Sequence, residues 1–331
     1  MGGILKLAVV IPFYQRQPGL LGTAVASIAA QRLRDDVTIT VIIVDDGSPV
    51  SAASEALPDL PGAGGVRIIA RSNGGVASAR NAGLDAVAAD TDYVAFLDSD
   101  DRWLPDHLQN GVDLLRQGAS FYFDNGYDTQ GRDRFTRTPF IRDHMGYAPE
   151  QPPCGRVFEG RRLFAALVTE CVPHTSQVIY DFQALGHHRF DESLRIAGED
   201  HLFWLTLTRS AALVGYHTGL MGARGFGISI NRDAFGWDKP ESLERLVDEI
   251  GLYTKIRRNF ASTADQRAAI DAKLAQDHDH FVFLALRNCT RNPGAVARAV
   301  GRASRIDAAL WRRAPASLLR LRTHRASFRT V

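Results

Sequence analysis

Cysteine is scarce in this sequence, with three residues among 331 and no Cys-x-x-Cys pair. A small, odd number argues against a disulfide framework and favours reduced thiols, as in a cytoplasmic protein. Long hydrophobic runs are missing too, because no stretch approaches the roughly 18 apolar residues of a membrane span. The apolar run after Lys6 ends at Pro12, which is too short for a signal-peptide core and its cleavage site. We therefore expect a cytoplasmic protein whose membrane contact, if it has any, is peripheral and on the inner face.

Two further absences argue against particular classes of protein. No Gly-x-Gly-x-x-Gly follows the first apolar run, which argues against a dinucleotide-dependent dehydrogenase. The net charge is only +2 and aromatic residues are not interleaved with the basic ones, so we expect no nucleic-acid partner. The composition is that of a folded globular protein, with 45% hydrophobic and 23% charged residues and enough length for one large domain or two.

The first hundred residues alternate apolar runs with helical patterns. The runs have the continuous apolar content of strands buried on both faces, and we expect Pro12 to end the first one. Such alternation predicts right-handed βαβ units and an α/β fold with a mostly parallel sheet. Each run ends in polar or acidic residues, at the edge where open α/β sheets bind ligands. The expected strands are 7–11, 38–44, 66–70 and 93–97, with helices at 20–31 and 76–89.

Beyond residue 103 the pattern is less regular. Residues 124–153 are polar, with Gly, Pro and Arg throughout, and we expect a long loop there. The last hundred residues carry amphipathic helical patterns, the final one basic. The expected strands are 119–123 and 176–180, and the expected helices are 108–115, 163–168, 198–207, 241–260, 264–287 and one from 293 to before 315.

An acidic cluster follows the fourth apolar run. Asp98 and Asp100 stand in an Asp-x-Asp pattern, which puts two side chains on the same side of an extended chain. Hard oxygen ligands at that spacing suit Mg²⁺ or Mn²⁺. The alternative is an acidic turn, since Asp and Ser are frequent turn formers. The cluster alone leaves both interpretations open.

Five short motifs stand in order along residues 5–230. They are Val9-Val-Ile-Pro-Phe-Tyr14, Val44-Asp-Asp-Gly-Ser48, Asn73-Gly-Gly-Val-Ala-Ser-Ala-Arg-Asn-Ala-Gly83, Phe96-Leu-Asp-Ser-Asp-Asp101, and Phe190-Asp-Glu-Ser-Leu194 leading into Gly198-Glu-Asp-His-Leu-Phe-Trp204. In order and spacing they resemble family 2 inverting glycosyltransferases. The resemblance implies a GT-A fold, a nucleoside diphosphate sugar donor, a saccharide or lipid-linked acceptor, and Mn²⁺ or Mg²⁺. It also implies a catalytic domain over 1–235 and leaves 236–331 as a helical extension with a basic tail.

The resemblance also implies which residues bind the donor. Asp46 has an acceptor-only carboxylate suited to an N–H of the nucleotide base, and Arg80 is suited to diphosphate oxygens. Tyr14 either contacts the base or packs on the sheet edge, and Asp45 is expected to bond its own turn. Asp100 is implied as the direct metal ligand, and Asp98 as a ribose or water-mediated metal contact. The donor-binding residues are Pro12, Tyr14, Asp46, Asn73, Arg80, Asp98 and Ser99, and the metal ligands are Asp100 and Asp98.

Glu199 and Asp200 supply the expected catalytic carboxylates. By position in the motif, Asp200 is the base that deprotonates the acceptor hydroxyl, and Glu199 contacts the acceptor. The alternative is that both simply favour a helix N-terminus. Trp204 could form part of the acceptor floor or pack in the core. Asp101 could be a helix cap, a group that holds a metal ligand in place, or a ligand itself.

One motif departs from the family pattern. Relatives often have an Arg-x-His pair where this chain has Arg224 and Phe226, which leaves Arg224 as a weaker diphosphate or acceptor candidate. His174 and His217 are alternatives that we do not adopt, because neither has a second ligand at metal spacing. Trp103 is expected to pack rather than to take part in chemistry.

Arginine dominates the end of the chain, with eleven from Arg287 onward against one acid, Asp307. On a helical wheel, apolar residues lie opposite an arginine face made of Arg298, Arg302, Arg305, Arg312 and Arg313. The face is either a solvated surface of a helix docked on the catalytic domain or a contact for anionic lipid at the inner membrane. Self-association through these helices is a further option. The rival functions are a nucleotidyltransferase and a non-catalytic nucleotide-sugar binding module.

Overall fold

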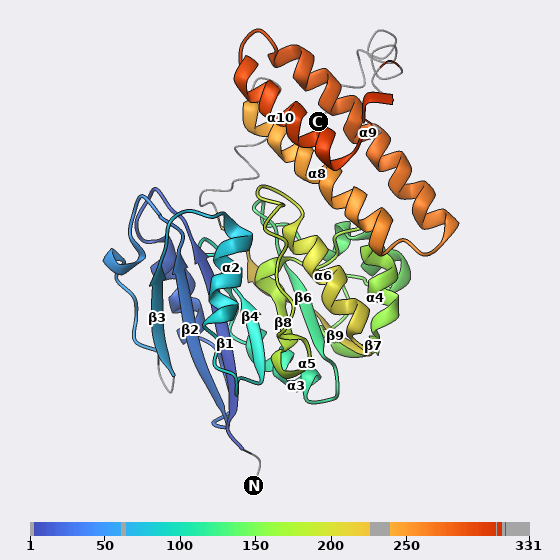
Figure 1. Ribbon diagram of the computed structural model, residues 1–331. Helices are drawn as coiled ribbons and strands as arrows, with labels where there is room; N and C mark the ends of the chain where they lie inside the picture. The colour runs from blue at the N-terminus through green and yellow to red at the C-terminus, as the bar shows by residue number, and fades with distance from the viewer. Residues whose placement is uncertain (1–2, 61–63, 226–238, 309, 313–314, 316–331) are drawn as a thin grey trace. The chain divides into compact units, whose positions relative to one another are not determined.

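The computed structural model describes residues 3–60, 64–225, 239–308, 310–312 and 315 (Figure 1). The chain divides into two compact units, one formed by 1–190 with 203–228 and the other by 191–202 with 229–331. The domain boundary expected after residue 235 falls outside the described residues and stays a prediction. The second unit includes a short segment, 191–202, that lies far from the rest of that unit in sequence.

The described residues of the first unit form one mixed, mostly parallel sheet of nine strands. Their order is β3-β2-β1-β4-β8-β6-β9-β5, and β7 pairs with β9. The first four strands are parallel to one another, as predicted, whereas β8 is antiparallel to both β4 and β6. The strands are β1 (Leu5–Phe13), β2 (Val37–Asp45), β3 (Gly65–Ala70), β4 (Tyr93–Phe96), β5 (Arg102–Trp103), β6 (Phe121–Tyr127), β7 (Gly155–Glu159), β8 (Val178–Asp181) and β9 (Leu213–Ala223).

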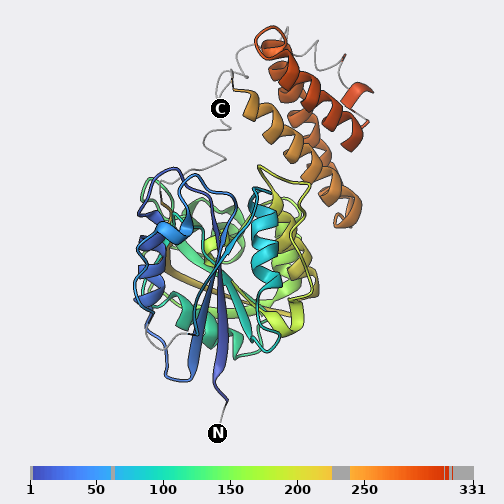
Figure 2. The same ribbon diagram turned by 60° about the vertical axis from the view of Figure 1, so that its left-hand side comes forward.

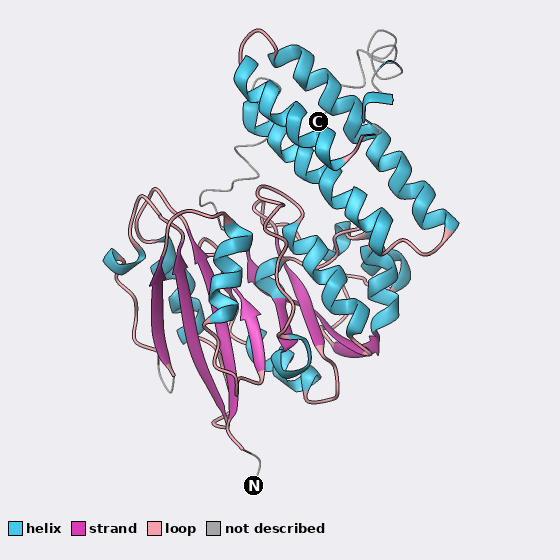
Figure 3. Cartoon of the chain, viewed as in Figure 1, coloured by secondary structure: helices cyan, strands magenta, loops and turns pink. Residues whose placement is uncertain are grey.

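Strand β1 does not stop at Pro12, contrary to our expectation, but runs to Phe13 in register with β2. Its pairing with β4 ends earlier, at Val10 opposite Phe96. Pro12 therefore lies where β1 has lost one neighbouring strand, and a missing N–H is tolerated there as it is on an edge strand. Pro12 and Phe13 extend β1 to the end of the sheet where the loops after β1, β2 and β3 lie (Figure 3).

Helices cover both faces of this sheet, which confirms the prediction. Apolar side chains of β1 and β2 that point to one face pack with α1 and α3, while Ile42 and Val44 on the other face pack with Ala79 of α2. Figure 2 shows α1 and α2 on opposite sides of the strands. The helices are α1 (Leu20–Ala29), α2 (Val76–Asp85), α3 (His107–Leu115), α4 (Gly160–Leu167), α5 (Phe182–Leu185) and α6 (Glu199–Ser210), the last beginning in the second unit and continuing in the first.

The region expected as a long loop is partly ordered. Strand β6 extends through Tyr127, and two short helical turns follow it. The short turns of this unit are η1 (Ala52–Ser54), η2 (Phe135–Arg137), η3 (Phe140–His144) and η4 (Thr175–Gln177).

The second unit is helical, as predicted, with α8 (Pro240–Asn259), α9 (Ala264–Asn288) and α10 (Pro293–Ile306). A capping box between Thr263 and Gln266 begins α9. Ala299 and Ala303 of α10 are buried, as the expected apolar face requires. Arg302 is a correction to the expected solvated face, because its guanidinium pairs with Glu244 and Asp248 of α8. No helix among the described residues is long and apolar enough to cross a membrane.

Candidate active site

Asp46 joins the loop after β2 to the loop before α2. Its carboxylate accepts the Gly74 N–H at 2.9 Å on Oδ1 and the Gly75 N–H at 2.8 Å on Oδ2, and Arg71 Nε lies 3.2 Å from Oδ1. Asn73 Nδ2 donates to the Asp46 carbonyl at 2.9 Å. A carboxylate has about four lone-pair positions, so these bonds leave Asp46 capacity for one more donor.

A second set of hydrogen bonds connects the loops that follow β1, β2 and β4. Asp45 accepts from the Ser48 and Ala52 N–H groups, each at 2.8 Å, which confirms that it bonds its own turn. Gln15 donates its main-chain N–H to Ser48 Oγ at 2.8 Å and its side-chain Nε2 to Ser99 Oγ at 3.1 Å. Buried Gln15 thus links the ends of β1, β2 and β4. Sequence analysis did not single it out, although it directly follows the first motif. Pro12 is buried in β1, and Tyr14 beside it is half-buried.

Arg80 and Asp98 meet at the end of β4. Arg80 Nη2 donates to Asp98 Oδ1 at 2.8 Å, and its guanidinium carbon lies 5.3 Å from the centre of the Phe190 ring. The Arg80 side chain is buried, while the Asp98 side chain is 28% exposed. One cation therefore already faces the carboxylate predicted to contact ribose or metal, and the diphosphate role of Arg80 stays a prediction.

Asp101 is a buried carboxylate with two donors. Ser176 Oγ donates to its Oδ2 at 2.6 Å and the Gly225 N–H to its Oδ1 at 2.9 Å, while the same Ser176 oxygen accepts the Asp98 N–H at 3.0 Å. Asp101 is not a helix cap, since α3 is preceded by Asp106. Burial, followed by the negative charges of Asp98 and Asp100, raises the pKa of Asp101 to about 7.

His174 completes a group able to hold a cation. One ligand atom each from Asp98, Asp101 and His174 lie within 4.8 Å of one another, and His174 Nδ1 is 3.7 Å from Asp101 Oδ2. Burial, and then the charges of Arg224, Arg134 and Arg80, hold the pKa of His174 well below its usual value, so the ring is neutral and available as a ligand. The two carboxylates are ligands that suit Mn²⁺ or Mg²⁺, whereas an imidazole nitrogen suits a transition metal better than Mg²⁺.

The predicted metal pair was Asp98 and Asp100. Asp100 is half-buried in the same loop, and Gly225 packs so closely on its carbonyl that a Cβ there would lie 1.5 Å away. His174 was considered and set aside, because no sequence spacing links it to the acidic cluster. Only the pairing of β4 with β8 brings the turn before β8 beside these carboxylates.

Glu199 and Asp200 lie in the first turn of α6, in the second unit. Gly198 precedes them at φ 88°, a left-handed conformation that favours glycine. Glu199 is buried, and Asp200 Oδ1 accepts the His201 N–H at 2.7 Å. Their position suits both a helix N-terminus and a catalytic role, so the assignment of Asp200 as the base stays a prediction.

The remaining candidates are more peripheral. Trp204 is fully buried among Phe96, Phe121 and Phe190, a position that supports packing rather than an acceptor floor. Trp103 is buried as expected. Arg224 is exposed, and its N–H donates to the Tyr127 carbonyl at 3.1 Å. Phe226, in the motif that departs from the family pattern, lies outside the described residues.

Loops that carry carboxylates follow the strands of a mixed sheet covered by helices, at the edge where open α/β proteins bind their ligands. The sequence profile described as "Glycosyl transferase family 2" matches residues 8–178, which is more than half of the chain. The chain therefore belongs to glycosyl transferase family 2 and is a glycosyltransferase.

Individual relatives agree with this placement. The succinoglycan biosynthesis protein ExoW of Rhizobium meliloti is 35% identical over 240 residues, which cover 68% of this chain and 70% of ExoW. The uncharacterized glycosyltransferase EpsJ of Bacillus subtilis is 28% identical over 222 residues, or 63% of this chain and 57% of EpsJ.

Two solved structures show the fold. S. aureus TarS 1–349 in complex with UDP-GlcNAc has a TM-score of 0.54 at 15% identity, covering 92% of this chain and 83% of TarS. The mannosyltransferase PcManGT from Pyrobaculum calidifontis, in complex with GDP-Man and Mn²⁺, has a TM-score of 0.50 at 14% identity, covering 96% and 86%. The fold is of the GT-A type, as predicted.

Proposed function

We propose that this glycosyltransferase moves a sugar from a nucleoside diphosphate sugar to an acceptor hydroxyl, with inversion and with the help of Mn²⁺ or Mg²⁺. The observation that carries the proposal is the cluster of Asp98, Asp101 and His174 at the end of β4, beside the half-buried Asp100. These side chains, at the carboxyl edge of the sheet, would hold a cation, which would supply positive charge for the diphosphate of the donor. The UDP-GlcNAc of TarS and the GDP-Man and Mn²⁺ of PcManGT support this class of donor.

The strand-end loops divide the donor between them. Asp46 accepts from the base, to which Pro12, Tyr14 and Asn73 also contribute contacts, while Ser99 and Asp98 contact the ribose. Asp98 and Asp100 would hold the cation, and Asp101 and His174, which lie close to Asp98, could serve as further ligands. When bound, the cation stabilises the charge of the departing diphosphate. Arg80 contributes a second positive charge from its place beside Asp98, and Arg224 is a further candidate for the diphosphate.

Transfer is a single displacement. Asp200 takes the proton of the acceptor hydroxyl as its oxygen attacks the anomeric carbon, and the bond from that carbon to the diphosphate oxygen breaks on the opposite side. Glu199 contacts the acceptor. The acceptor is a saccharide or a lipid-linked saccharide, which the succinoglycan biosynthesis of ExoW supports. The exposed arginines of α10 are proposed to meet anionic lipid, and the helices of the second unit offer a surface for self-association.

The donor is tested first by thermal shift with UDP, GDP and their sugars, each with and without Mn²⁺. A shift that needs both one nucleoside diphosphate and the metal is expected. A shift with nucleoside triphosphates, together with pyrophosphate release, would indicate a nucleotidyltransferase. Metal-linked binding without any release of diphosphate would indicate a binding module.

Two variants then test the roles of the carboxylates. Asp200→Asn is expected to abolish transfer while donor binding survives, because only the base is lost. Asp100→Ala is expected to lose the metal-dependent part of donor binding, and Asp101→Ala in parallel shows which of the two contacts the metal. Normal turnover by the Asp200 variant would defeat the assignment of the base.

A further inference from the structure

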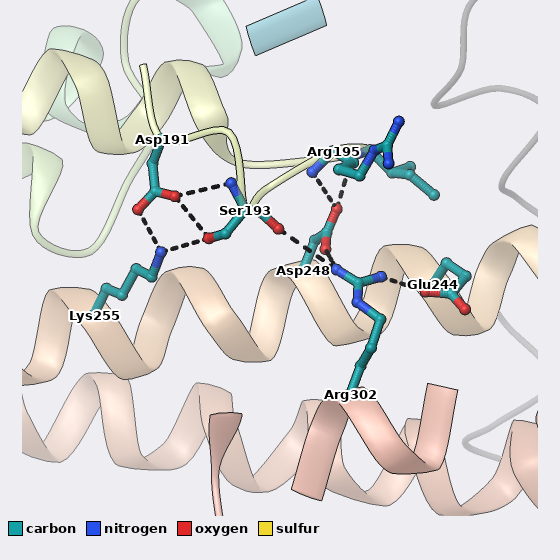
Figure 4. Close-up of polar contacts among 8 residues, drawn as sticks. Asp191, Ser193, Arg195, Glu244, Asp248, Lys255 and Arg302 are labelled. Atoms are coloured by element: carbon teal, nitrogen blue, oxygen red, sulfur yellow. Dashed lines mark hydrogen bonds and ion pairs between the residues drawn. The ribbon is translucent and has the colours of Figure 1, made fainter. Parts of the chain in front are cut away.

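Segment 191–198, which leads into Glu199 and Asp200, lies along one face of α8 (Figure 4). The residues of α8 that contact it lie at positions i, i+3, i+4 and i+7, as residues on a single helical face do. They are Asp248, Gly251, Leu252 and Lys255. Both partners belong to the second unit, so these contacts lie within one compact body.

Asp248 makes the central contact. Its carboxylate is fully buried, and Oδ2 accepts the main-chain N–H groups of Arg195 at 2.8 Å and Ile196 at 2.7 Å. Arg302 of α10 donates to Oδ1 at 2.7 Å and also pairs with Glu244. The same guanidinium lies 3.5 Å from the Ser193 carbonyl oxygen. One buried carboxylate thus connects the segment to two helices far away in sequence.

Contacts on either side of Asp248 extend the attachment. Lys255 pairs with Asp191 and donates to Ser193 Oγ at 2.7 Å. Burial would raise the pKa of Asp191, but the hydrogen bonds from Lys255 and Ser193 outweigh it and leave this pKa below its ordinary value. At the other end, Gly198 packs on Leu252 so closely that a Cβ would lie 2.8 Å from Cδ2.

We propose that α8 and α10 form a clamp on segment 191–198 that positions the first turn of α6, which carries Glu199 and Asp200, and that Asp248 is its central positioning residue. This inference rests on the proposed role of Asp200 as the base. The bonds of Asp248 go to main-chain N–H groups, so they fix the path of the backbone whatever side chains stand at 195 and 196. A buried ion pair adds little net stability in place of an apolar pair, so its contribution is to geometry. A catalytic group must be held closely, since a misplacement of about 1 Å can cost roughly 100-fold in rate.

The clamp itself is tested by hydrogen exchange, which needs no activity. In Asp248→Ala the amides of Arg195 and Ile196 lose their acceptor, and exchange in the peptide covering 191–202 is expected to speed up at least about tenfold. Asp277→Ala is the matched control, because Asp277 is equally buried in this unit but pairs with Lys273 on its own helix. Equal exchange of that peptide in the two variants would overturn the clamp.

The consequence of the clamp for catalysis is tested by steady-state kinetics. The measured quantity is the release of diphosphate from the donor found by thermal shift, with p-nitrophenyl glycosides as acceptors. Asp248→Ala is expected to lower kcat roughly 10- to 100-fold and leave the donor KM unchanged, because the proposed donor residues lie in the first unit. Asp248→Asn keeps an oxygen that accepts from the two N–H groups, and Arg302→Lys keeps the positive charge. Both variants should therefore retain most of the kcat of the unmodified chain. Asp277→Ala should retain the kcat of the unmodified chain.

The two levels of proposal fail differently. Normal turnover by Asp200→Asn removes the proposed base, whatever the exchange data show. An inactive Asp200→Asn with a normal kcat in Asp248→Ala leaves the base in place and rejects the positioning role. If Asp248→Ala does not fold, Asp248→Asn and Arg302→Lys are measured in its place. A loss of kcat in these variants that follows their loss of thermal stability, and that Asp277→Ala shares, would also reject the positioning role of Asp248.

Discussion

Asp101 illustrates how one buried side chain sets the chemistry of its loop. It lies within hydrogen-bonding distance of Ser176 and Gly225, and its pKa is raised to about 7 by burial and by the charges of Asp98 and Asp100. A group whose folded pKa is raised favours the folded state most when protonated. The stability it contributes is therefore complete below the ordinary pKa of 3.8 and is lost as the pH rises to about 7.

Asp101→Asn is predicted to remove this loss in metal-free protein. The variant is neutral at every pH, so its gain in melting temperature should be small near pH 4 and reach its full size above pH 7. Thermal melts in EDTA at pH 4.5, 6 and 8 measure it. Asp35→Asn, at an exposed aspartate, controls for the removal of one negative charge. A gain that is the same at all three pH values, or equal in the control, would contradict the prediction.

Residue roles could be predicted where local sequence determines them. Asp45 bonds the turn that directly follows it, so its neighbours in sequence were sufficient. Ser176 and His174 reach Asp101 from the turn before β8, about 75 positions away, and Gly225 comes from farther still. No spacing rule connects these residues, since the connection exists only once β8 pairs with β4.

At the scale of elements, the first four strands were predictable because they are continuous apolar runs in a parallel sheet. Besides the end of β1, one further detail was wrong: β3 is an edge strand, with Val66 and Ile68 more than a third exposed, rather than a buried one. Strands β5, β7 and β9 were missed. β5 has two residues, β7 follows the region interpreted as loop, and β9 contains three glycines that weaken its pattern.

Gly198 combines a left-handed backbone with close packing on α8, and Gly198→Ala is predicted to destabilise the chain. Alanine at φ 88° costs about 1–2 kcal/mol. The new Cβ would also lie 2.8 Å from Leu252 Cδ2 and 3.2 Å from its Cβ, which moves only with α8. Overpacking of this kind adds roughly 1–3 kcal/mol. Urea unfolding measures the sum.

Gly19→Ala provides the matched control. Gly19 has φ 92° and likewise precedes a helix, but its added Cβ would meet nothing within 4 Å. It should therefore show the backbone cost alone. If the two variants lose the same stability, the close packing of Gly198 on α8 is not the cause of its sensitivity.

At the scale of the whole molecule, the C-terminal helices could be predicted from the sequence, but their relation to the last of the five motifs could not. Segment 191–202 carries a family motif, yet it forms a compact unit with α8, α9 and α10. Asp248 and Arg302 each look like a charged residue on an amphipathic helix. Only packing turns them inward to meet the main chain of 195–196 and each other.

The same packing redefines the basic surface. Arg302 pairs with Glu244 and Asp248. Among the described residues of the expected arginine face, this leaves Arg298, Arg305 and Arg312 exposed, and Arg313 lies outside the described residues. Deleting the chain from Pro293 would remove Arg302 from its partners and would test folding together with membrane binding. Substitution of exposed arginines separates the two effects.

Arg298→Glu/Arg305→Glu is therefore predicted to abolish binding to anionic liposomes without unfolding the protein. Each basic residue near such a surface contributes about 1 kcal/mol, so reversing two should lower the partition coefficient at least about tenfold at low salt. Co-sedimentation across a salt series measures it, with Arg67→Glu/Arg161→Glu, at two exposed arginines of the first unit, as the charge-matched control. Binding that is independent of salt and equal in both variants would leave α10 with its packing role alone. Selective loss in the first variant would assign lipid contact to the side of α10 that Arg302 does not occupy.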